Sequence, residues 1–258
     1  MRFAIIGGTG FCSVGDVGAR HALPVQTDYG VGPVEVVSIA GQEVAFIARH
    51  GRDHTVPPHL INYRANIAAL KALGVTHILA SAAVGTLNAA MQPGDFALPD
   101  QFLDFTRGRP STFFDGKSGV RHLDMTRPYC PQLHEELQRA GTFLGEDLHP
   151  AAVYVCTEGP RFETTAEIEM FRQLGGDLVG MTGVPEAPLA REAGICYAAL
   201  AVITNWAAGM AERPLDHDEI SAHMSGQMAT VQRIFASVIE TWRERPCFNC
   251  RPSTSEDA

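Results

Sequence analysis

The stretch FAIIGGTG at residues 3–10 decides the class of fold that the chain can adopt. Its first four residues are apolar without alternation, which is typical of a strand buried on both faces of a sheet. Gly7, Gly8 and Gly10, with Thr9 between them, mark a tight turn out of that strand. The segment therefore predicts the first strand of an α/β domain, with a glycine-rich loop at its carboxyl end.

Further apolar runs repeat this pattern along the chain. Helical periodicity lies between several of them, over 60–74 and 218–242, and a capping-box sequence opens another helix at Thr164. We expect one α/β domain over residues 1–245, with a central mixed β-sheet flanked by helices, and a polar, flexible tail over 246–258. The predicted strands are 3–6, 44–48, 77–80, 152–156, 177–179 and 197–203.

Length and charge limit the kinds of partner. The 258 residues are 45% hydrophobic and 19% charged, which suits a domain with a substantial core and excludes intrinsic disorder. A net charge of -9 repels a polyphosphate backbone, so we expect no nucleic-acid partner. No apolar run reaches the roughly 18 to 20 residues of a membrane span, and the N-terminus shows no signal sequence. We therefore expect a cytoplasmic protein without a membrane partner.

The six cysteines do not indicate a metal site by their spacing. Cys247 and Cys250 form the one closely spaced pair, and no second such pair or histidine pair completes a set of four ligands. The other cysteines mostly lie in apolar runs, where a cysteine behaves as a small hydrophobic residue. We expect no metal, and we expect the pair to tether the tail or to be incidental.

Small and polar residues follow almost every predicted strand. The carboxyl ends of such strands share one edge of a sheet, so these residues should surround one pocket. Backbone N–H groups, hydroxyls and a guanidinium are the donors that hold a phosphate. Residues of this kind occur in the segments 7–10, 49–54, 81–85 and 181–183, where they include Thr9, Arg49, His50 and Thr182.

The remaining loops suit a planar heterocycle. Phe162 and Met181 offer surfaces for stacking, and Glu163 and Asn205 offer polar groups that can read the edge of a ring. Each of these residues taken alone is more often a turn, cap, surface or core residue. Because they gather at one end of the predicted sheet beside a phosphate site, the sequence indicates nucleoside chemistry.

Five motifs resemble the trimeric nucleoside phosphorylases, a family that includes methylthioadenosine phosphorylase and the purine nucleoside phosphorylases acting on 6-oxopurines. The motifs occur in order and at fitting spacing over nearly the whole chain up to about residue 242. They are IIGGTG at 5–10, RHGRDHTVPPHLINYRANIAALK at 49–71, AAVGTLNAAMQPGDF at 82–96, TEGPRFETTAE at 157–167 and GMTGVPEAPLAREAGICYA at 180–198.

The resemblance implies reversible phosphorolysis, in which inorganic phosphate attacks C1′ of a nucleoside and releases the free base and ribose 1-phosphate. Phosphate is then a co-substrate, and no cofactor is expected. The implied catalytic residues are Arg49 and His50 at the phosphate and Asn205, which would stabilise negative charge on the leaving purine. His122 matches a histidine that reaches the ribose pocket of the neighbouring subunit, so a homotrimer or a dimer of trimers is expected.

The resemblance also assigns the remaining residues of the site. Many relatives carry a Thr where this chain has Ala82, so one hydroxyl is missing from the implied phosphate site. The phosphate residues are Thr9, Arg49, His50, Thr182 and the backbone of Ala82 and Ala83, with His54 nearby. The nucleoside residues are Phe162, Glu163, Met181, Asn205, Trp206, Ala207, His217 and His122.

Three positions bear on the identity of the purine. Adenine-type relatives carry Asp, a second acid and Ser where this chain has Asn205, Ala207 and Glu163. A 6-oxopurine carries a hydrogen on N1 that the Glu163 carboxylate can accept, whereas N1 of adenine is itself an acceptor. We therefore expect inosine and guanosine as substrates.

His217 bears on the sugar. It falls where 6-oxopurine phosphorylases carry a His beside the ribose 5′-hydroxyl and methylthioadenosine phosphorylases carry a small apolar residue. An imidazole suits a 5′-hydroxyl better, because a methylthio group would leave it without a partner. Methylthioinosine and methylthioadenosine phosphorylases are the alternatives.

Two other classes of function compete with a phosphorylase. An NAD(P)-dependent oxidoreductase is one, since GGTGF after a first strand also opens many dinucleotide-binding domains. The third glycine of that fingerprint is replaced by Ser13, however, and the chain has no Tyr-x-x-x-Lys pair. A catalytically inactive purine sensor is the other, but a sensor has no need of the phosphate residues.

Overall fold

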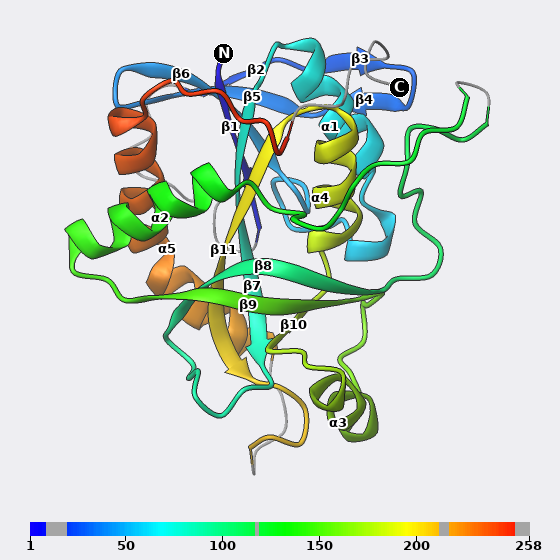
Figure 1. The fold of residues 1–258 in the computed structure, drawn as a ribbon, viewed down its shortest axis with the longest axis vertical. Helices are drawn as coiled ribbons and strands as arrows, with labels where there is room; N and C mark the ends of the chain where they lie inside the picture. The colour runs from blue at the N-terminus through cyan, green and yellow to red at the C-terminus, as the bar shows by residue number, and fades with distance from the viewer. Residues whose placement is uncertain (9–19, 117–118, 212–216, 251–258) are drawn as a thin grey trace.

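The computed structural model describes residues 1–8, 20–116, 119–211 and 217–250 (Figure 1). Within them, a sheet of mixed direction has the strand order β10-β9-β8-β11-β7-β1-β6-β5-β2 and is flanked by helices, as predicted. The elements are β1 (Phe3–Gly7), β2 (His21–Ala22), β3 (Val25–Thr27), β4 (Gly30–Gly32), β5 (Val34–Ile39), β6 (Gln42–Ala48), the 3₁₀ helix η2 (Pro58–Leu60), α1 (Tyr63–Ala72), β7 (His77–Thr86), β8 (Phe96–Phe105), α2 (Pro131–Leu144), β9 (Leu148–Thr157), α3 (Thr165–Gln173), β10 (Leu178–Gly180), α4 (Gly183–Glu192), β11 (Cys196–Trp206) and α5 (His217–Thr241).

Helices cover both faces of the central strands. Figure 1 shows α2 and α5 on one side of β1, β7 and β11, and α1 and α4 on the other. Alternate residues of β1 separate accordingly: Phe3 and Ile5 pack in the core that contains α2 and α5, and Ala4 and Ile6 in the core of α1 and α4. The prediction of a strand buried on both faces is thereby confirmed.

Five strands close into a ring. The pairs β7–β11, β11–β8, β8–β9 and β9–β10 are completed by an antiparallel pairing of β10 with the end of β7 at Gly85 and Thr86. In Figure 1, β8 and β9 cross in front of β7 and β11. The ring brings the carboxyl ends of β7, β9, β10 and β11 toward one region of the molecule.

The predicted strands and helices are present, but the described residues also contain β2, β3, β4, β5 and α2, which the sequence patterns did not predict. Four further features differ from the sequence-based expectation. Strand β8 was missed because Pro99, Asp100 and Gln101 interrupt its apolar pattern, and α4 because it contains two prolines. Residues 81–85, expected to form a loop, continue β7 as a strand. Residues 246–250, expected in the flexible tail, are folded onto the core, where Cys247 and Cys250 are buried. In the described part of the chain, no helix combines the length and apolar character needed to cross a membrane.

Candidate active site

A cavity of about 460 Å³ lies at the carboxyl ends of β1, β6, β7, β10 and β11. It receives residues from strands that are far apart in sequence, as the strand-end argument predicted. Of the residues predicted for the phosphate and nucleoside sites, its lining contains Arg49, His50, Ala82, Ala83, Phe162, Glu163, Met181, Thr182, Asn205 and Ala207.

Two of the predicted residues that the structure describes are not part of this lining. Trp206 and His122 do not contact the cavity of their own chain, and His122 is exposed. Thr9 lies outside the described residues, as does the side chain of His217. Position 217 nevertheless begins α5, three residues before Ile220, which lines the cavity. Helical spacing puts positions 217 and 220 on one face of α5.

A gap in strand pairing opens one edge of β7 to the cavity. Strand β1 pairs with β7 as far as Ala80, and β10 pairs with the same edge again only at Gly85. Between them, no strand in the described ranges pairs with this edge. The Ser81 carbonyl points there, because it accepts a hydrogen bond from Arg49 Nη1 at 2.9 Å. The alternation of a strand then directs the backbone N–H of Ala83 to the cavity and that of Ala82 toward β11.

Arg49 is held in place by a buried carboxylate that the sequence analysis did not identify. Its Nε and Nη2 donate to the two oxygens of Glu186 at 2.9 and 2.8 Å, and both side chains are about 1% exposed. The Tyr197 hydroxyl donates to the same carboxylate at 2.7 Å. Burial lowers the pKa of Arg49, but Glu186 raises it by more, so the guanidinium stays charged. Gly8 leaves room for it, since a Cβ there would lie 3.0 Å from Nη1.

His50 is neutral at physiological pH. Burial and then the charge of Arg49 lower the pKa of His50 from 6.5 to about 4. Its Nδ1 lies 2.9 Å from the Val56 carbonyl, which can only accept, so the proton of the neutral ring is on Nδ1. Nε2 therefore presents a lone pair, which can accept a hydrogen bond from a protonated phosphate oxygen.

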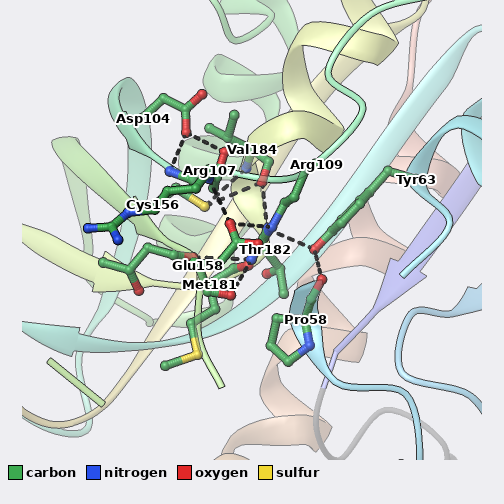
Figure 2. Close-up of polar contacts among 12 residues, drawn as sticks. Pro58, Tyr63, Asp104, Arg107, Arg109, Cys156, Glu158, Met181, Thr182 and Val184 are labelled. Atoms are coloured by element: carbon green, nitrogen blue, oxygen red, sulfur yellow. Dashed lines mark hydrogen bonds and ion pairs between the residues drawn. The ribbon is translucent and has the colours of Figure 1, made fainter. Parts of the chain in front are cut away.

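Arg109 fixes the loop that carries Met181 and Thr182 (Figure 2). Its guanidinium donates to the carbonyl oxygens of Met181 and Val184 at 2.7 and 2.8 Å and to that of Glu158 at 2.7 Å. It thereby ties the end of β9 to the turn between β10 and α4. Since Arg109 is buried and comes from a segment without regular structure, no sequence pattern indicated its role.

We expect Arg109→Leu to lower both stability and activity. The change leaves several buried carbonyl oxygens without a donor, at about 1–3 kcal/mol each, and releases the 181–184 turn from the end of β9. Thermal unfolding and nucleoside kinetics measure the two effects. Arg107→Leu is the control, because Arg107 is exposed and bonds Glu158 only through its backbone N–H. Equal behaviour of the two variants would contradict the assigned role of Arg109.

Glu163 is a half-buried carboxylate in the cavity wall. Its Oε1 accepts a hydrogen bond from the Thr157 hydroxyl at 2.6 Å, which orients the group. Burial raises the pKa of Glu163, although the bond from Thr157 lowers it in part. The second oxygen, Oε2, is the one available to accept a donor from a ligand.

A β-bulge sets the position of Asn205. The pairing of β11 with β7 shifts by one residue at Thr204, so Ile203 faces Val84 and Asn205 faces Gly85. The Thr204 hydroxyl donates to Asn205 Oδ1 at 2.8 Å, and Asn205 Nδ2 donates to the Trp206 carbonyl at 2.8 Å. One N–H of the amide and one lone pair of its oxygen remain for a ligand. A Cβ at Gly85 would lie 3.0 Å from Nδ2, so only glycine admits the amide here.

The described residues thus form one cavity with two kinds of lining. Arg49, the free edge of β7 and Thr182 supply cationic and neutral donors for an anion, and His50 Nε2 supplies an acceptor for a protonated oxygen of that anion. Glu163 and Asn205 supply acceptors and a donor for a ring edge, beside the apolar side chains of Phe162 and Met181.

Comparison with known proteins identifies the family to which the chain belongs. The sequence profile of the Phosphorylase superfamily matches residues 2–240. The chain belongs to that superfamily. The resemblance to nucleoside phosphorylases drawn from the sequence motifs is confirmed, and the match favours a phosphorylase over a nicotinamide-dependent oxidoreductase.

Individual relatives of this phosphorylase superfamily member carry different substrate names. It is 53% identical over 221 residues to a probable 6-oxopurine nucleoside phosphorylase of Moorella thermoacetica, covering 85% of each chain. It is 52% identical over 222 residues to a probable S-methyl-5′-thioinosine phosphorylase of Methanopyrus kandleri, covering 84% of this chain and 83% of that one. A methylthioadenosine phosphorylase structure from an antarctic soil metagenomic library superposes with a TM-score of 0.87 at 36% identity, covering 96% of this chain and 90% of that one.

Proposed function

We propose that the chain is a purine nucleoside phosphorylase that cleaves 6-oxopurine nucleosides, inosine and guanosine, with inorganic phosphate. One observation carries the proposal: donors suited to phosphate and the pair Glu163 and Asn205 line the same cavity. Relatives named for this activity share about half of their residues with the chain. Phosphate is the co-substrate, and the proposed reaction needs no cofactor.

The roles follow from the geometry. Arg49, preoriented by Glu186, and neutral His50 hold phosphate for attack on C1′, together with Thr182 and the Ala83 N–H. Binding the two reactants in one cavity removes the entropic cost of bringing them together. As the glycosidic bond breaks, negative charge develops on the purine. The free N–H of Asn205 stabilises that charge at N7 and O6.

The Glu163 carboxylate favours binding of a 6-oxopurine over binding of adenine. Its Oε1 is occupied by Thr157, so Oε2 accepts the N1 hydrogen of hypoxanthine or guanine. With adenine, the carboxylate would face the N1 lone pair without a proton between them. The absence of an acid at Ala207 agrees with this choice, because an exocyclic amino group would gain from one.

The sugar carries a 5′-hydroxyl in this proposal. The support is His217 at the start of α5, three positions before the cavity residue Ile220. Because one close relative is named for 6-oxopurine nucleosides and another for S-methyl-5′-thioinosine, overall identity does not separate the two sugars.

We expect His217→Val to lower kcat/KM for inosine and to leave methylthioinosine unaffected or improved. The hydroxyl loses a polar partner, at about 0.5–1.5 kcal/mol, or roughly 2- to 10-fold in rate, while the methylthio group gains an apolar neighbour. Steady-state kinetics with both substrates measure the change. A larger loss with methylthioinosine than with inosine would reverse the sugar assignment.

The proposed enzyme is a homotrimer or a dimer of trimers. His122 is exposed and is absent from the cavity lining of its own chain, which suits a residue that completes a neighbour's ribose pocket. This is tested by mixing His122→Ala subunits with subunits whose phosphate site is inactivated by Arg49→Met. In a mixed oligomer, some pockets combine an intact phosphate site from one subunit with an intact His122 from its neighbour. Activity should therefore reappear in the mixture although each variant alone has lost it. The cytoplasmic location stays a prediction.

A substrate panel tests the proposed function. Inosine, guanosine, adenosine, methylthioadenosine and methylthioinosine are each incubated with and without phosphate, and release of free base is followed. We expect phosphate-dependent release that is fastest with inosine or guanosine. Faster cleavage of adenosine or methylthioadenosine would overturn the base assignment, and saturable nicotinamide-dinucleotide binding without base release would overturn the phosphorylase itself.

A further inference from the structure

Four cysteines from three separate parts of the chain meet in the core. Cys130 is the N-cap of α2, Cys196 begins β11, and Cys247 and Cys250 lie in the segment after α5. All four are buried, and their Sγ atoms lie within 4.8 Å of one another. The sequence analysis found only the Cys247 and Cys250 pair, because the other two ligand positions come from distant elements.

The spacing of the sulfurs fits a tetrahedron around a metal ion. With zinc–sulfur bonds of about 2.3 Å, the edges of a tetrathiolate site measure about 3.8 Å. Cys130 Sγ and Cys247 Sγ are 3.7 Å apart. A disulfide needs about 2.05 Å, and the cysteines of the cluster are free thiols. The mutual approach of all four sulfurs is also unlike two separate disulfides, which would form two short pairs.

The surroundings hold the cluster together. Gln132 Nε2 donates to the Pro246 carbonyl at 2.7 Å, and Arg245 Nη2 donates to Glu135 at 2.7 Å, so the segment after α5 is fixed against α2. Asn249 Nδ2 lies 3.8 Å from Cys250 Sγ as a donor. Cys130 is the N-cap of the 14-residue helix α2, which fixes its position at the cluster.

We infer that Cys130, Cys196, Cys247 and Cys250 form a structural binding site for one zinc ion. Tetrahedral coordination by four thiolates is the arrangement of structural zinc sites, and the two-residue spacing of Cys247 and Cys250 is typical of them. On binding, each of the four thiols releases its proton to solvent and forms one bond to Zn²⁺. No electron transfer or further reactant is involved. All four positions are occupied by protein, so the ion has no open position for a substrate.

The site is structural because it lies far from the nucleoside cavity. Cys196 and Asn205 are at opposite ends of β11, nine residues apart, which corresponds to about 30 Å along an extended strand. The ion links the end of α5 to the start of α2 and of β11. Zinc loss should therefore lower thermal stability without changing the pocket that carries out the proposed phosphorolysis.

Metal analysis of the full-length wild-type protein is the first test. The chain is purified under reducing conditions from cells grown with zinc, and metals are measured by inductively coupled plasma mass spectrometry. We expect about one zinc per chain, and thiol titration in the folded state should show the four cysteines protected until zinc is removed. Refolding with Co²⁺ should give the intense visible bands of a tetrahedral tetrathiolate complex.

The variant Cys247→Ser/Cys250→Ser is the second test, with Cys156→Ser as the control. Cys156 is also buried but lies outside the cluster, 3.4 Å from the Val184 carbonyl. The double variant should hold less than about a tenth of the wild-type zinc and unfold at a lower temperature, whereas Cys156→Ser should keep its zinc. Wild-type protein that contains no zinc, contains iron instead, or shows two disulfides by mass spectrometry would overturn the inference. These readouts do not depend on phosphorolysis.

Discussion

Replacing Arg49 with Met is expected to lower kcat/KM for phosphate by about 10³-fold. The guanidinium is the one buried cation among the described cavity residues, and Glu186 and Tyr197 hold it in a fixed orientation. Methionine fills much of the same space but offers neither charge nor donors. The remaining donors of the proposed phosphate site cannot replace a preoriented charge.

The same change affects folding, so the two effects must be separated. Without Arg49, Glu186 is a buried carboxylate that lacks its counter-ion, which costs about 3–5 kcal/mol. The double variant Arg49→Met/Glu186→Gln removes both charges and keeps an acceptor for Tyr197. We expect it to recover most of the lost stability in urea unfolding, while phosphate use stays as low as in the single variant.

One outcome of the double-variant experiment would contradict the role assigned to Arg49. A stable double variant with the wild-type KM for phosphate would show that Arg49 supports the fold and not the phosphate. Arg52→Met is the matched control, since it removes an arginine three residues away whose side chain is 65% exposed. Its phosphate kinetics should equal those of the wild type.

The second large effect concerns the base. We expect the wild type to prefer inosine over adenosine by about 10⁴-fold, because adenine leaves the half-buried Glu163 carboxylate facing a lone pair. Asn205→Asp should lower the inosine rate by about 10²- to 10³-fold and shift preference toward 6-aminopurines, since a carboxylate accepts from N6 but cannot donate to O6. Glu163→Ala should lower activity on both inosine and guanosine.

The ratio of kcat/KM for inosine and adenosine measures this discrimination, with phosphate held at saturation. Arg161→Ala is the control, because Arg161 is exposed and lies two residues from Glu163. If Asn205→Asp and Glu163→Ala both keep the wild-type ratio, the assignment of the base is wrong.

The preference for inosine over adenosine should also depend on pH. Because burial raises the pKa of Glu163, the ratio of kcat/KM for inosine and adenosine should fall toward acidic pH, where a protonated carboxyl donates to adenine N1.

Sequence patterns predicted the parts of the fold that depend on local periodicity. Unbroken apolar runs identified β1, β6 and β11, and the capping box at Thr164 opens α3 as expected. The patterns failed where tertiary pairing overrides composition. Residues 81–85 resemble a loop in their small side chains, yet pairing with β11 makes them strand, and the gap beside them gives the cavity its free backbone edge.

The residues of the candidate site divide in the same way, into those that local sequence patterns indicate and those that depend on tertiary contacts. Arg49, His50, Glu163 and Asn205 were predicted to share one pocket because they follow strands at the edge where ligands bind, and they line the same cavity. Glu186 could not be found in that way, because it lies within α4 and reaches the cavity only through Arg49. Arg109 and the cysteine cluster were missed for a related reason: their partners are 46 to 117 residues away in sequence.

The most direct test of the account is the product balance of a single reaction. Inosine is incubated with the protein over a range of phosphate concentrations, and hypoxanthine and ribose 1-phosphate are both quantified. The account predicts that hypoxanthine release saturates with phosphate and that one ribose 1-phosphate forms for each base released. Release of hypoxanthine with free ribose, or at a rate independent of phosphate, would contradict it.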